Sequence, residues 1–285
     1  MRKLFVLFIL MHFAFLTGFM SDIPVEIEKV NLNLSENELA ITFLQLSSGE
    51  ATLIQKGNGE NALINTGGPS TQKELQNLLE MYDVLKFNAI IMTKEGSQYD
   101  SNLAWLTKAY LVDEVIIGKN ATKLLEKISL NDYNNVVNWS EGEKHQVLHD
   151  LSFQILHEKV AVDGNAEMDL LLTYRNHQVL YMSSSKFEVE RQLINLNLKD
   201  VNILKVAEFA NENSTSQMLL EHIDPQAAII FSKKGVKPSQ EVIERLHETW
   251  IDIYQTKQFG NVTIKFTDDN YEVITITVKN VQDKS

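Results

Sequence analysis

The chain has 285 residues, no cysteine and a formal net charge of −12 at pH 7. The missing cysteines exclude disulfides, thiolate metal sites and cysteine nucleophiles, and the negative charge disfavours nucleic acid as a partner because phosphate backbones are repelled. A hydrophobic content of 44% supports a globular core.

Residues 1–21 predict a membrane-directed leader. Arg2 and Lys3 precede residues 4–21, which contain no Asp, Glu, Lys or Arg. At about 1.5 Å per residue, a helix of this length just crosses the hydrocarbon core of a membrane, but the pattern is also typical of a secretory signal peptide. Bulky residues near the candidate cleavage points leave both interpretations open. In either case we expect an extracytoplasmic protein, secreted or, if residues 4–21 are not removed, anchored in the membrane.

The sequence then predicts a polar linker over residues 22–38 and a domain over residues 39–280. Strands are expected at 41–46, 51–55 and 61–65. An Asn-Gly step joins the last two and is typical of a tight hairpin turn. We therefore expect these strands to form an antiparallel meander.

The rest of the chain predicts an alternation of strands and helices. A capping box at Thr71–Glu74 opens a helix that continues to about residue 82, and a second capping box is expected at Ser185–Glu188. Further helices are expected at 103–110, 122–128 and 241–248, and strands at 87–92, 114–118, 145–148, 151–157, 169–174, 178–182, 202–206, 227–232, 261–266 and 271–278. Both halves have strands followed by strand and helix alternation, which predicts two sheets packed face to face with helices outside.

Two motifs near the start of the domain carry a resemblance to a known family. Residues 41–54 end in Gln-Leu-Ser-Ser-Gly-Glu-Ala-Thr-Leu-Ile, and residues 61–68 read Asn-Ala-Leu-Ile-Asn-Thr-Gly-Gly. These segments resemble the opening of metallo-β-lactamase-fold domains, most of all the C-terminal extracellular domain of the DNA-uptake protein ComEC. The resemblance extends over about residues 39–278. It implies an α/β fold, an αβ/βα four-layer sandwich, with the site at one edge between the two halves.

The loop after residue 93 departs from the metal-binding motif of that family. The motif has the form Thr-His-x-(His or Asp)-x-Asp-His, and aligning it on the threonine places Lys94, Gly96, Gln98 and Tyr99 at the ligand positions. A protonated lysine has no lone pair, glycine has no side chain, glutamine is a weak neutral donor, and a tyrosine would have to bind as phenolate. Zinc hydrolases need about three nitrogen, sulfur or carboxylate ligands per metal. The resemblance therefore implies a site without its metal ligands.

The later motifs show the same kind of loss. Ser184 stands where the family has the metal-bridging Asp of a Thr-Gly-Asp motif, although a one-residue slip would place Ser185 there. Glu208 and Phe209 replace the histidines of Leu-Lys-Val-Pro-His-His-Gly, and Asn65 replaces an Asp of the first motif. We therefore predict no catalytic residue, no metal and no cofactor at these positions.

Other side chains offer replacements for the lost ligands. Glu95, Asp100, Glu208 and Glu212 form a candidate carboxylate cluster in the cleft, which would suit a hard cation better than zinc. Alternatively, we expect Lys94 to pair with a carboxylate such as Glu208 and to supply a fixed positive charge in place of the missing cation.

The histidines offer a weaker candidate site. His145 and His149 are four residues apart, a spacing that would align them on a helix, but the surrounding sequence favours two short strands around a polar turn. His157 and His177 are expected at the surface or at strand ends. We therefore assign no metal role to the histidines.

Three hypotheses for function remain open. The first is a noncatalytic metallo-β-lactamase-like protein, exported to the cell envelope, that binds an envelope protein or a small ligand at the emptied cleft. The second is a divergent ComEC-like hydrolase of the phosphodiesterase or nuclease type, in which relocated carboxylates hold a metal such as zinc. The third is a structural accessory of a membrane complex.

Overall fold

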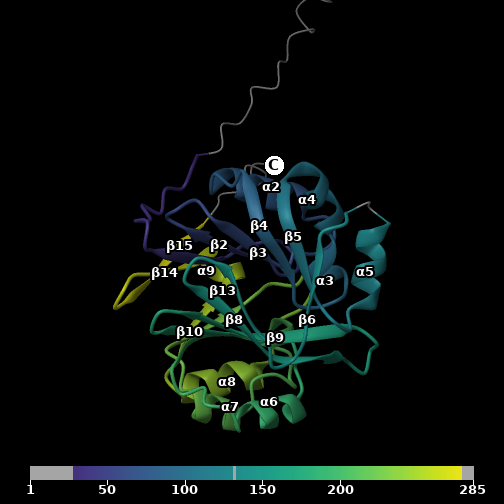
Figure 1. Cartoon of the computed structure of the whole chain (residues 1–285). Coiled ribbons are helices and arrows are strands. Elements are labelled where there is room, and N and C mark those ends of the chain that lie inside the picture. The colour runs from purple at the N-terminus through teal and green to yellow at the C-terminus, as the bar shows by residue number, and fades with distance from the viewer. Residues whose placement is uncertain (1–27, 131–132, 278–285) are drawn as a thin grey trace, which may run out of the picture.

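A computed structural model describes residues 28–130 and 133–277 of the chain. Two β-sheets pack face to face and helices cover their outer surfaces, so that four layers follow one another from top to bottom in Figure 1. The predicted αβ/βα sandwich is therefore confirmed. The predicted leader lies outside the described residues, and within them no helix is both long and apolar enough to cross a membrane.

The first sheet contains the predicted meander. It consists, in spatial order, of β15 (Tyr271–Ile276), β14 (Asn261–Phe266), β1 (Leu39–Phe43), β2 (Thr52–Lys56), β3 (Asn61–Ile64), β4 (Lys86–Met92), β5 (Leu111–Gly118) and β6 (Val136–Trp139). Strands β1, β2 and β3 are antiparallel, whereas β3 to β6 are parallel. The C-terminal hairpin returns to this sheet because β14 pairs with β1, with Val262 opposite Phe43.

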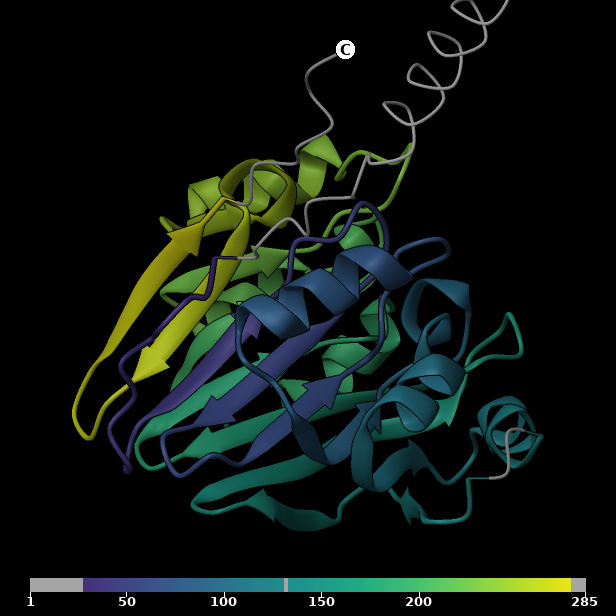
Figure 2. The ribbon, with the colours of Figure 1, turned by 90° about the horizontal axis from the view of Figure 1, so that it is seen from above.

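The outer face of the first sheet is covered by helices from its crossover connections. These are α2 (Gln72–Met81), α4 (Leu103–Ala109) and α5 (Thr122–Ser129), and α2 lies across the sheet in the view from above (Figure 2). Helix α2 buries Leu75, Leu78 and Leu79, the apolar face that its sequence predicts.

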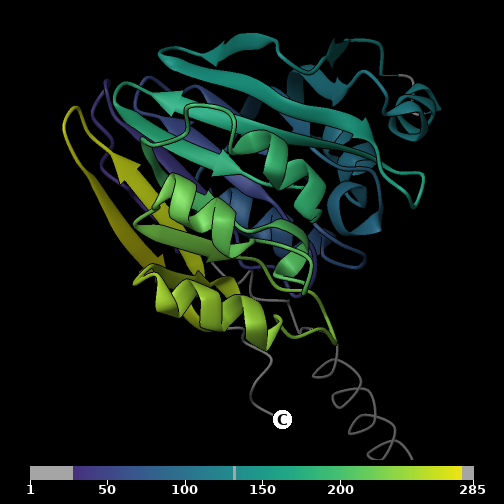
Figure 3. The same ribbon diagram turned by 90° about the horizontal axis from the view of Figure 1, so that it is seen from below.

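The second sheet belongs to the second half of the chain. Its order is β13 (Asp252–Gln255), β12 (Ala227–Ile230), β11 (Val201–Lys205), β10 (His177–Tyr181), β9 (Ala166–Tyr174), β8 (Leu151–Val160) and β7 (Lys144–Leu148). Strands β10 to β13 are parallel, and α6 (Phe187–Leu193), α7 (Gln217–Ile223) and α8 (Gln240–Glu248) cover their outer face in the view from below (Figure 3).

The central strands of the first sheet, β1 to β4, are largely buried on both faces. In β4, Ala89 and Ile91 point into the core between the sheets, whereas Ile90 and Met92 pack under the outer helices. Because both faces are covered, this strand is a continuous apolar run, as parallel strands usually are.

Both predicted capping boxes are wrong in detail. Helix α2 does begin after Thr71, but the Thr71 hydroxyl donates to the carbonyl of Gly68, and Glu74 accepts from the amide and hydroxyl of Ser47. Helix α6 begins one residue later than expected, with Lys186 as its N-cap residue. In both cases a residue of the expected cap takes part in a tertiary hydrogen bond, Glu74 with Ser47 and Ser185 with Asn211.

Some short elements were not predicted. They are β6, β13, α3 (Ser97–Asp100), α9 (Thr256–Phe259) and a 3-10 turn, η1 (Ala207–Phe209). Each has three or four residues, which is too few for a periodic pattern to show.

Candidate functional site

The loops that follow the parallel strands meet at one edge of the sandwich. The carboxyl ends of β4, β10 and β11 lead into residues 93–99, 182–186 and 206–211, and these loops contain most of the predicted ligand positions. Ligands of open α/β sheets bind at such an edge. The arrangement therefore places the degenerate motifs where a site of this architecture is expected.

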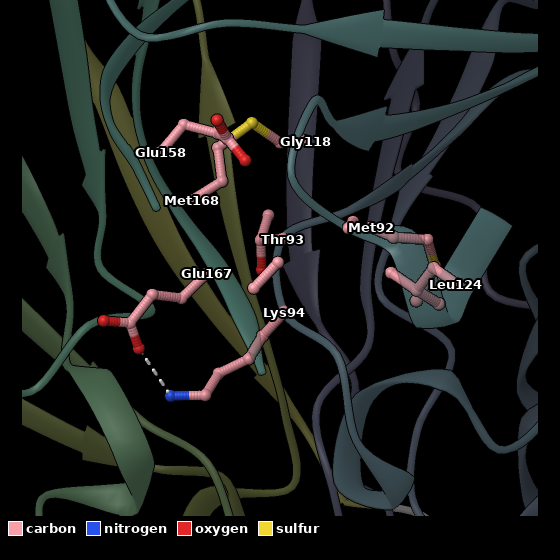
Figure 4. A pocket seen from close by; sticks show the side chains of 10 residues that line it. Met92, Thr93, Lys94, Gly118, Leu124, Glu158, Glu167 and Met168 are labelled. Atoms are coloured by element: carbon pink, nitrogen blue, oxygen red, sulfur yellow. Dashed lines mark hydrogen bonds and ion pairs between the residues drawn. The ribbon is translucent and has the colours of Figure 1, made fainter. Parts of the chain in front are cut away.

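Lys94 lies at the centre of this edge. Its side chain is only 7% exposed, and its amine is 2.9 Å from an Oε atom of Glu167, a residue of β9, as Figure 4 shows. The amine also pairs with Glu208 and donates to the carbonyl of Ser183 at 3.3 Å. The predicted Lys94–Glu208 pair is confirmed.

The two carboxylates keep Lys94 charged. Burial alone would lower the pKa of the Lys94 amine, but the negative charges and hydrogen bonds of Glu208 and Glu167 raise it well above its ordinary value. Lys186 lies 3.4 Å from the other oxygen of Glu167. The edge therefore carries a permanent ammonium, enclosed by carboxylates, among the ligand positions.

The backbone at Glu208 is strained. Glu208, Phe209 and Ala210 have φ angles of 47°, 58° and 58°, in the left-handed region that residues other than glycine seldom adopt. Such conformations cost about 1 kcal/mol or more each and persist where the surroundings hold them. The turn directs Glu208 toward Lys94.

Two aromatic side chains complete the group around Lys94. Tyr99 and Phe209 stack with ring centroids 6.0 Å apart, and the Lys94 amine is 6.0 Å from the Tyr99 ring centroid. Burial, followed by the nearby charges of Glu50 and Glu208, raises the pKa of the Tyr99 phenol well above its ordinary value. The phenol therefore stays protonated and is a poor metal ligand.

Gly96 and Gln98 do not face Lys94. Gly96, with φ of 126°, precedes the short helix α3. The side-chain oxygen of Gln98 accepts a hydrogen bond from the Ser48 hydroxyl at 2.7 Å. Gln98 therefore ties the segment after β4 to the loop between β1 and β2.

Asn65 and Ser184 hold neighbouring loops. Asn65 Oδ1 accepts from the amide of Thr93 at 2.9 Å, and its amide group donates to the Thr93 hydroxyl at 2.9 Å. Asp169 accepts from the amide and the hydroxyl of Ser184. Both residues therefore fix the loops that carry Lys94 and its neighbours.

Comparisons with known proteins give sequence relatives of this chain, although no family model matches it. It is 25% identical over 250 residues to recombination protein 2 of Haemophilus influenzae, a match that covers 84% of this chain and 30% of that protein. It is 22% identical over 259 residues to ComE operon protein 3 of Bacillus subtilis, covering 77% and 33%. The chain thus spans about a third of the length of the curated relatives it matches.

Solved structures identify the fold. The metallo-β-lactamase fold protein YhfI of Bacillus subtilis superposes with a TM-score of 0.57 and 9% identity, over 81% of this chain and 100% of that one. The chain has the metallo-β-lactamase fold. Zinc-bound PqqB of Methylobacterium extorquens gives a TM-score of 0.56 at 7% identity over 79% of this chain and 99% of that one. A diphosphatase of the PhnP family gives 0.53 at 12% identity over 81% and 98%.

The metal implied by the metallo-β-lactamase fold does not fit the residues present here. At two of the loop positions, Lys94 and Gly96, the side chain offers no lone pair to a metal ion. The side-chain oxygen of Gln98 already accepts a hydrogen bond from Ser48. Within the described part of the chain, no three His, Asp or Glu side chains are grouped so that they could hold a metal ion. The predicted ligand position 94 instead holds a lysine that pairs with Glu167 and Glu208.

The candidate carboxylate cluster does not form. Glu95 accepts hydrogen bonds from the backbone amides of Leu124, at 3.0 Å, and Ala166, at 2.8 Å, and so ties α5 to β9. Asp100 pairs with Lys127 at 2.8 Å. Glu95 and Asp100 thus have structural partners of their own, Glu208 is held by Lys94, and Glu212 is exposed.

The histidines also lie apart from Lys94. His145 is in β7 and stacks on Trp139 at 4.9 Å, which confirms the strand interpretation. The expectation is confirmed for His177, which is the first residue of β10, and wrong for His157, which is only 4% exposed. Strand β8 continues to Val160, so His157 lies inside the strand, paired with Asp169 of β9.

Three residues of the site were missed in the sequence. Glu167 and Asp169 alternate at the start of β9, whose other residues up to Leu172 are apolar and buried. Two acidic side chains at positions i and i+2 of a buried strand lie on the same face of the sheet and need polar partners there. This spacing is the feature of the sequence that could have indicated both residues. Glu50 stands in the opening motif at residues 41–54 and was given no role there, yet it forms a fully buried ion pair with Lys205.

The crevices in the described part of the chain that come nearest to a pocket are very small. One lies beside Lys94, between residues of β4, β9 and α5, and has no room for a water molecule (Figure 4). Another, between α4 and α5, has about 10 Å³. Of the predicted ligand positions, only Lys94 lines the first crevice, which therefore offers no room for a ligand on the α5 side of the lysine.

Proposed function

We propose that this chain is a noncatalytic metallo-β-lactamase-fold protein of the cell envelope that binds a partner or small ligand at the rim of the emptied site. One observation carries the proposal. The Lys94 ammonium, held by Glu167 and Glu208, lies among the positions that supply metal ligands in this fold.

A metal and this ammonium are mutually exclusive on electrostatic grounds. Two unit charges of like sign 4 Å apart repel by about 4 kcal/mol at an effective dielectric constant of about 20, and a divalent ion doubles that figure. Displacing Lys94 would also leave its buried amine without partners, which costs several kcal/mol. The same carboxylates cannot hold both cations.

The rim, by which we mean the turn at residues 208–210 and the loop over residues 231–239, is the part of the site that remains open to a partner. The loop over residues 231–239 lies against the strained turn, because the amide of Ser239 donates to the carbonyl of Ala210 at 2.7 Å. The Lys233 amine lies 5.7 Å from the centroid of the Phe209 ring. Exposed Lys234 and Lys237 follow on the same loop. This surface is accessible, whereas the crevice beside Lys94 is closed.

Residues 4–21 support a place in the cell envelope. They have no charged side chain and follow two basic residues, a pattern that directs a chain to the membrane. The site would then lie in the extracytoplasmic space, either on an anchored or on a secreted protein.

A divergent hydrolase is the less favoured alternative. It would need relocated carboxylates, but Glu95 holds backbone amides, and Asp100 and Glu208 pair with lysines. A purely structural accessory would differ from a binding protein in one respect, because the membrane complex would keep its function when the rim residues of this chain are replaced.

Metal analysis of the full chain, purified in detergent and dialysed against zinc and manganese, tests the proposal. We expect substoichiometric metal and no hydrolysis of bis(p-nitrophenyl) phosphate by the wild type. Lys94→Gln removes the ammonium and leaves two carboxylates, so this variant should bind more divalent metal than the wild type. Lys186→Gln, which keeps Lys94, is the matched control and should remain metal-poor. Stoichiometric metal together with hydrolysis in the wild type would overturn the proposal.

A further inference from the structure

A pair of exposed leucines marks the pole of the domain opposite the site. Leu85 and Leu111 are 79% and 67% exposed. Leu111 opens β5 and pairs in register with Lys86, so the two leucines are neighbours at the amino ends of two adjacent parallel strands. The site lies at the carboxyl ends of these strands, on the other side of the molecule.

Aromatic rings adjoin the two leucines. Tyr110, next to Leu111, meets Trp105 edge to face at 5.8 Å and lies 5.4 Å from the ring of Phe87. Trp105 and Tyr110 are half-buried, whereas Lys86 and Lys108 beside them are exposed. We call Leu85, Trp105, Tyr110 and Leu111 the Leu85–Leu111 patch. Exposed apolar side chains flanked by half-buried Trp and Tyr and by lysines are typical of surfaces at a membrane interface.

The chain enters the domain next to this patch. Lys29 pairs with Asp83, and the amide of Val30 donates to the carbonyl of Met81 at 2.9 Å. Asp83 is two residues from Leu85 in the sequence. Only residues 22–28 separate Lys29 from the apolar stretch that ends at residue 21, and a fully extended chain spans at most about 3.3–3.6 Å per residue, or roughly 25 Å here.

We infer that the Leu85–Leu111 patch rests on the surface of the lipid bilayer in which residues 4–21 are anchored. The inference rests on the anchored form of the proposed function. The short connection keeps the patch near the bilayer, and contact with lipid removes both leucines from water. As a consequence, the strained turn and the lysine-bearing loop of the site point away from the membrane, toward partners in the extracytoplasmic space.

Single-cysteine labelling of the full chain tests this inference, because the natural chain contains no cysteine. Leu85→Cys and Leu111→Cys place a polarity-sensitive fluorophore on the patch. Val162→Cys is the matched control, since Val162 is 97% exposed at the tip of the β8–β9 hairpin, near the site. Each labelled chain is reconstituted into nanodiscs of phosphatidylethanolamine and phosphatidylglycerol, with and without a nitroxide-labelled lipid. Flotation of the same chains with vesicles of this composition reports anchoring separately.

We expect the nitroxide lipid to reduce the fluorescence at positions 85 and 111 by about half or more and to leave position 162 nearly unchanged, since interfacial groups lie within about 5–10 Å of the headgroup boundary. Equal quenching at all three positions in chains that float would overturn the inference alone. Blue-shifted emission at 85 and 111 without lipid quenching would assign the patch to a protein partner or a second copy instead. Failure to float would overturn both the inference and membrane anchoring, whereas metal binding would still be decided by the separate analysis of Lys94.

Discussion

In the described part of the chain, two buried lysines form ion pairs that join one half of the sandwich to the other, and the environments of these lysines differ. Lys94 follows β4 of the first sheet and faces two carboxylates of the second half, Glu167 and Glu208. Lys205, in β11 of the second sheet, is fully buried and pairs with a single carboxylate of the first half, Glu50. Both are cross-links between the sheets, but only Lys94 stands at a ligand position of the fold.

The pKa values of the two lysines are shifted in opposite directions. Burial lowers the pKa of Lys205, and the single charge of Glu50 does not compensate. Burial also acts on Lys94, but two carboxylates outweigh it and raise its pKa. Burial likewise raises the pKa of Glu50. The surroundings of Lys94, at a predicted ligand position, therefore favour its charged form, whereas burial disfavours the charged form of Lys205.

Removing the charge of Lys94 should have the largest effect on the free energy of unfolding. Lys94→Met keeps the length of the side chain and leaves Glu167 and Glu208 close together without their cation. Breaking a buried pair in this way costs about 3 kcal/mol or more of the free energy of unfolding. Urea unfolding at pH 7 measures the loss. The control, Lys186→Met, removes a partly exposed lysine that faces the same glutamate at 3.4 Å, and we expect a loss of about 0–1 kcal/mol.

The pH dependence of the same two proteins separates charge from packing. A raised pKa in the folded state means that the contribution of Lys94 is fully present below the unfolded value, about 10.4, and is lost as the pH rises through the folded value. The stability difference between wild type and Lys94→Met should therefore be constant near neutral pH and shrink only in strong alkali. A difference that shrinks between pH 6 and 9 would contradict the assignment.

A substitution in the strained turn beside Lys94 should raise the free energy of unfolding, whereas Lys94→Met lowers it. Ala210 has φ of 58° and aligns with the glycine of the related His-His-Gly motif. Ala210→Gly relieves the left-handed strain, and after the entropy cost of glycine we expect a gain of about 0.5–1 kcal/mol in the free energy of unfolding. The matched control is Ala207→Gly, at a position with ordinary φ in the same turn, which should lose stability. If both variants lose stability, the turn is not strained at Ala210.

Much of the fold could be predicted because its elements are long and periodic. The apolar face of α2 and the buried run of β4 are local patterns, and both appear where the sequence places them. The return of β14 to β1 could not be predicted, because this pairing joins residues more than 200 positions apart, such as Phe43 and Val262. Short elements such as β6 and β13 have too few residues to show a period.

The site was predictable only where a motif marked it. Lys94 and Glu208 occupy aligned ligand positions, so their pairing followed from the alignment and from the need to balance a buried charge. Glu167 lies 73 residues from Lys94, outside any motif. Its contact comes from an isolated backbone bridge between Lys94 and Glu167, beside which the amide of Met168 donates to the carbonyl of Thr93 at 2.7 Å. Sequence reasoning therefore found one carboxylate of the pair and missed the other.

Replacing both partners of the Lys205–Glu50 pair should have the smallest effect on the free energy of unfolding. The pKa directions of Lys205 and Glu50 show that both charged forms are disfavoured by burial. Replacing a buried ion pair by apolar residues of similar volume is often neutral or stabilising, so Lys205→Met with Glu50→Leu should change the free energy of unfolding by about 1 kcal/mol or less. Lys205→Met alone should cost more, because it leaves a fully buried carboxyl group to take up a proton. Urea unfolding of the single and double variants at pH 7 measures both quantities. If the double variant loses as much stability as Lys94→Met, the Lys205 pair is a net stabilising interaction, and the two lysines differ only in position.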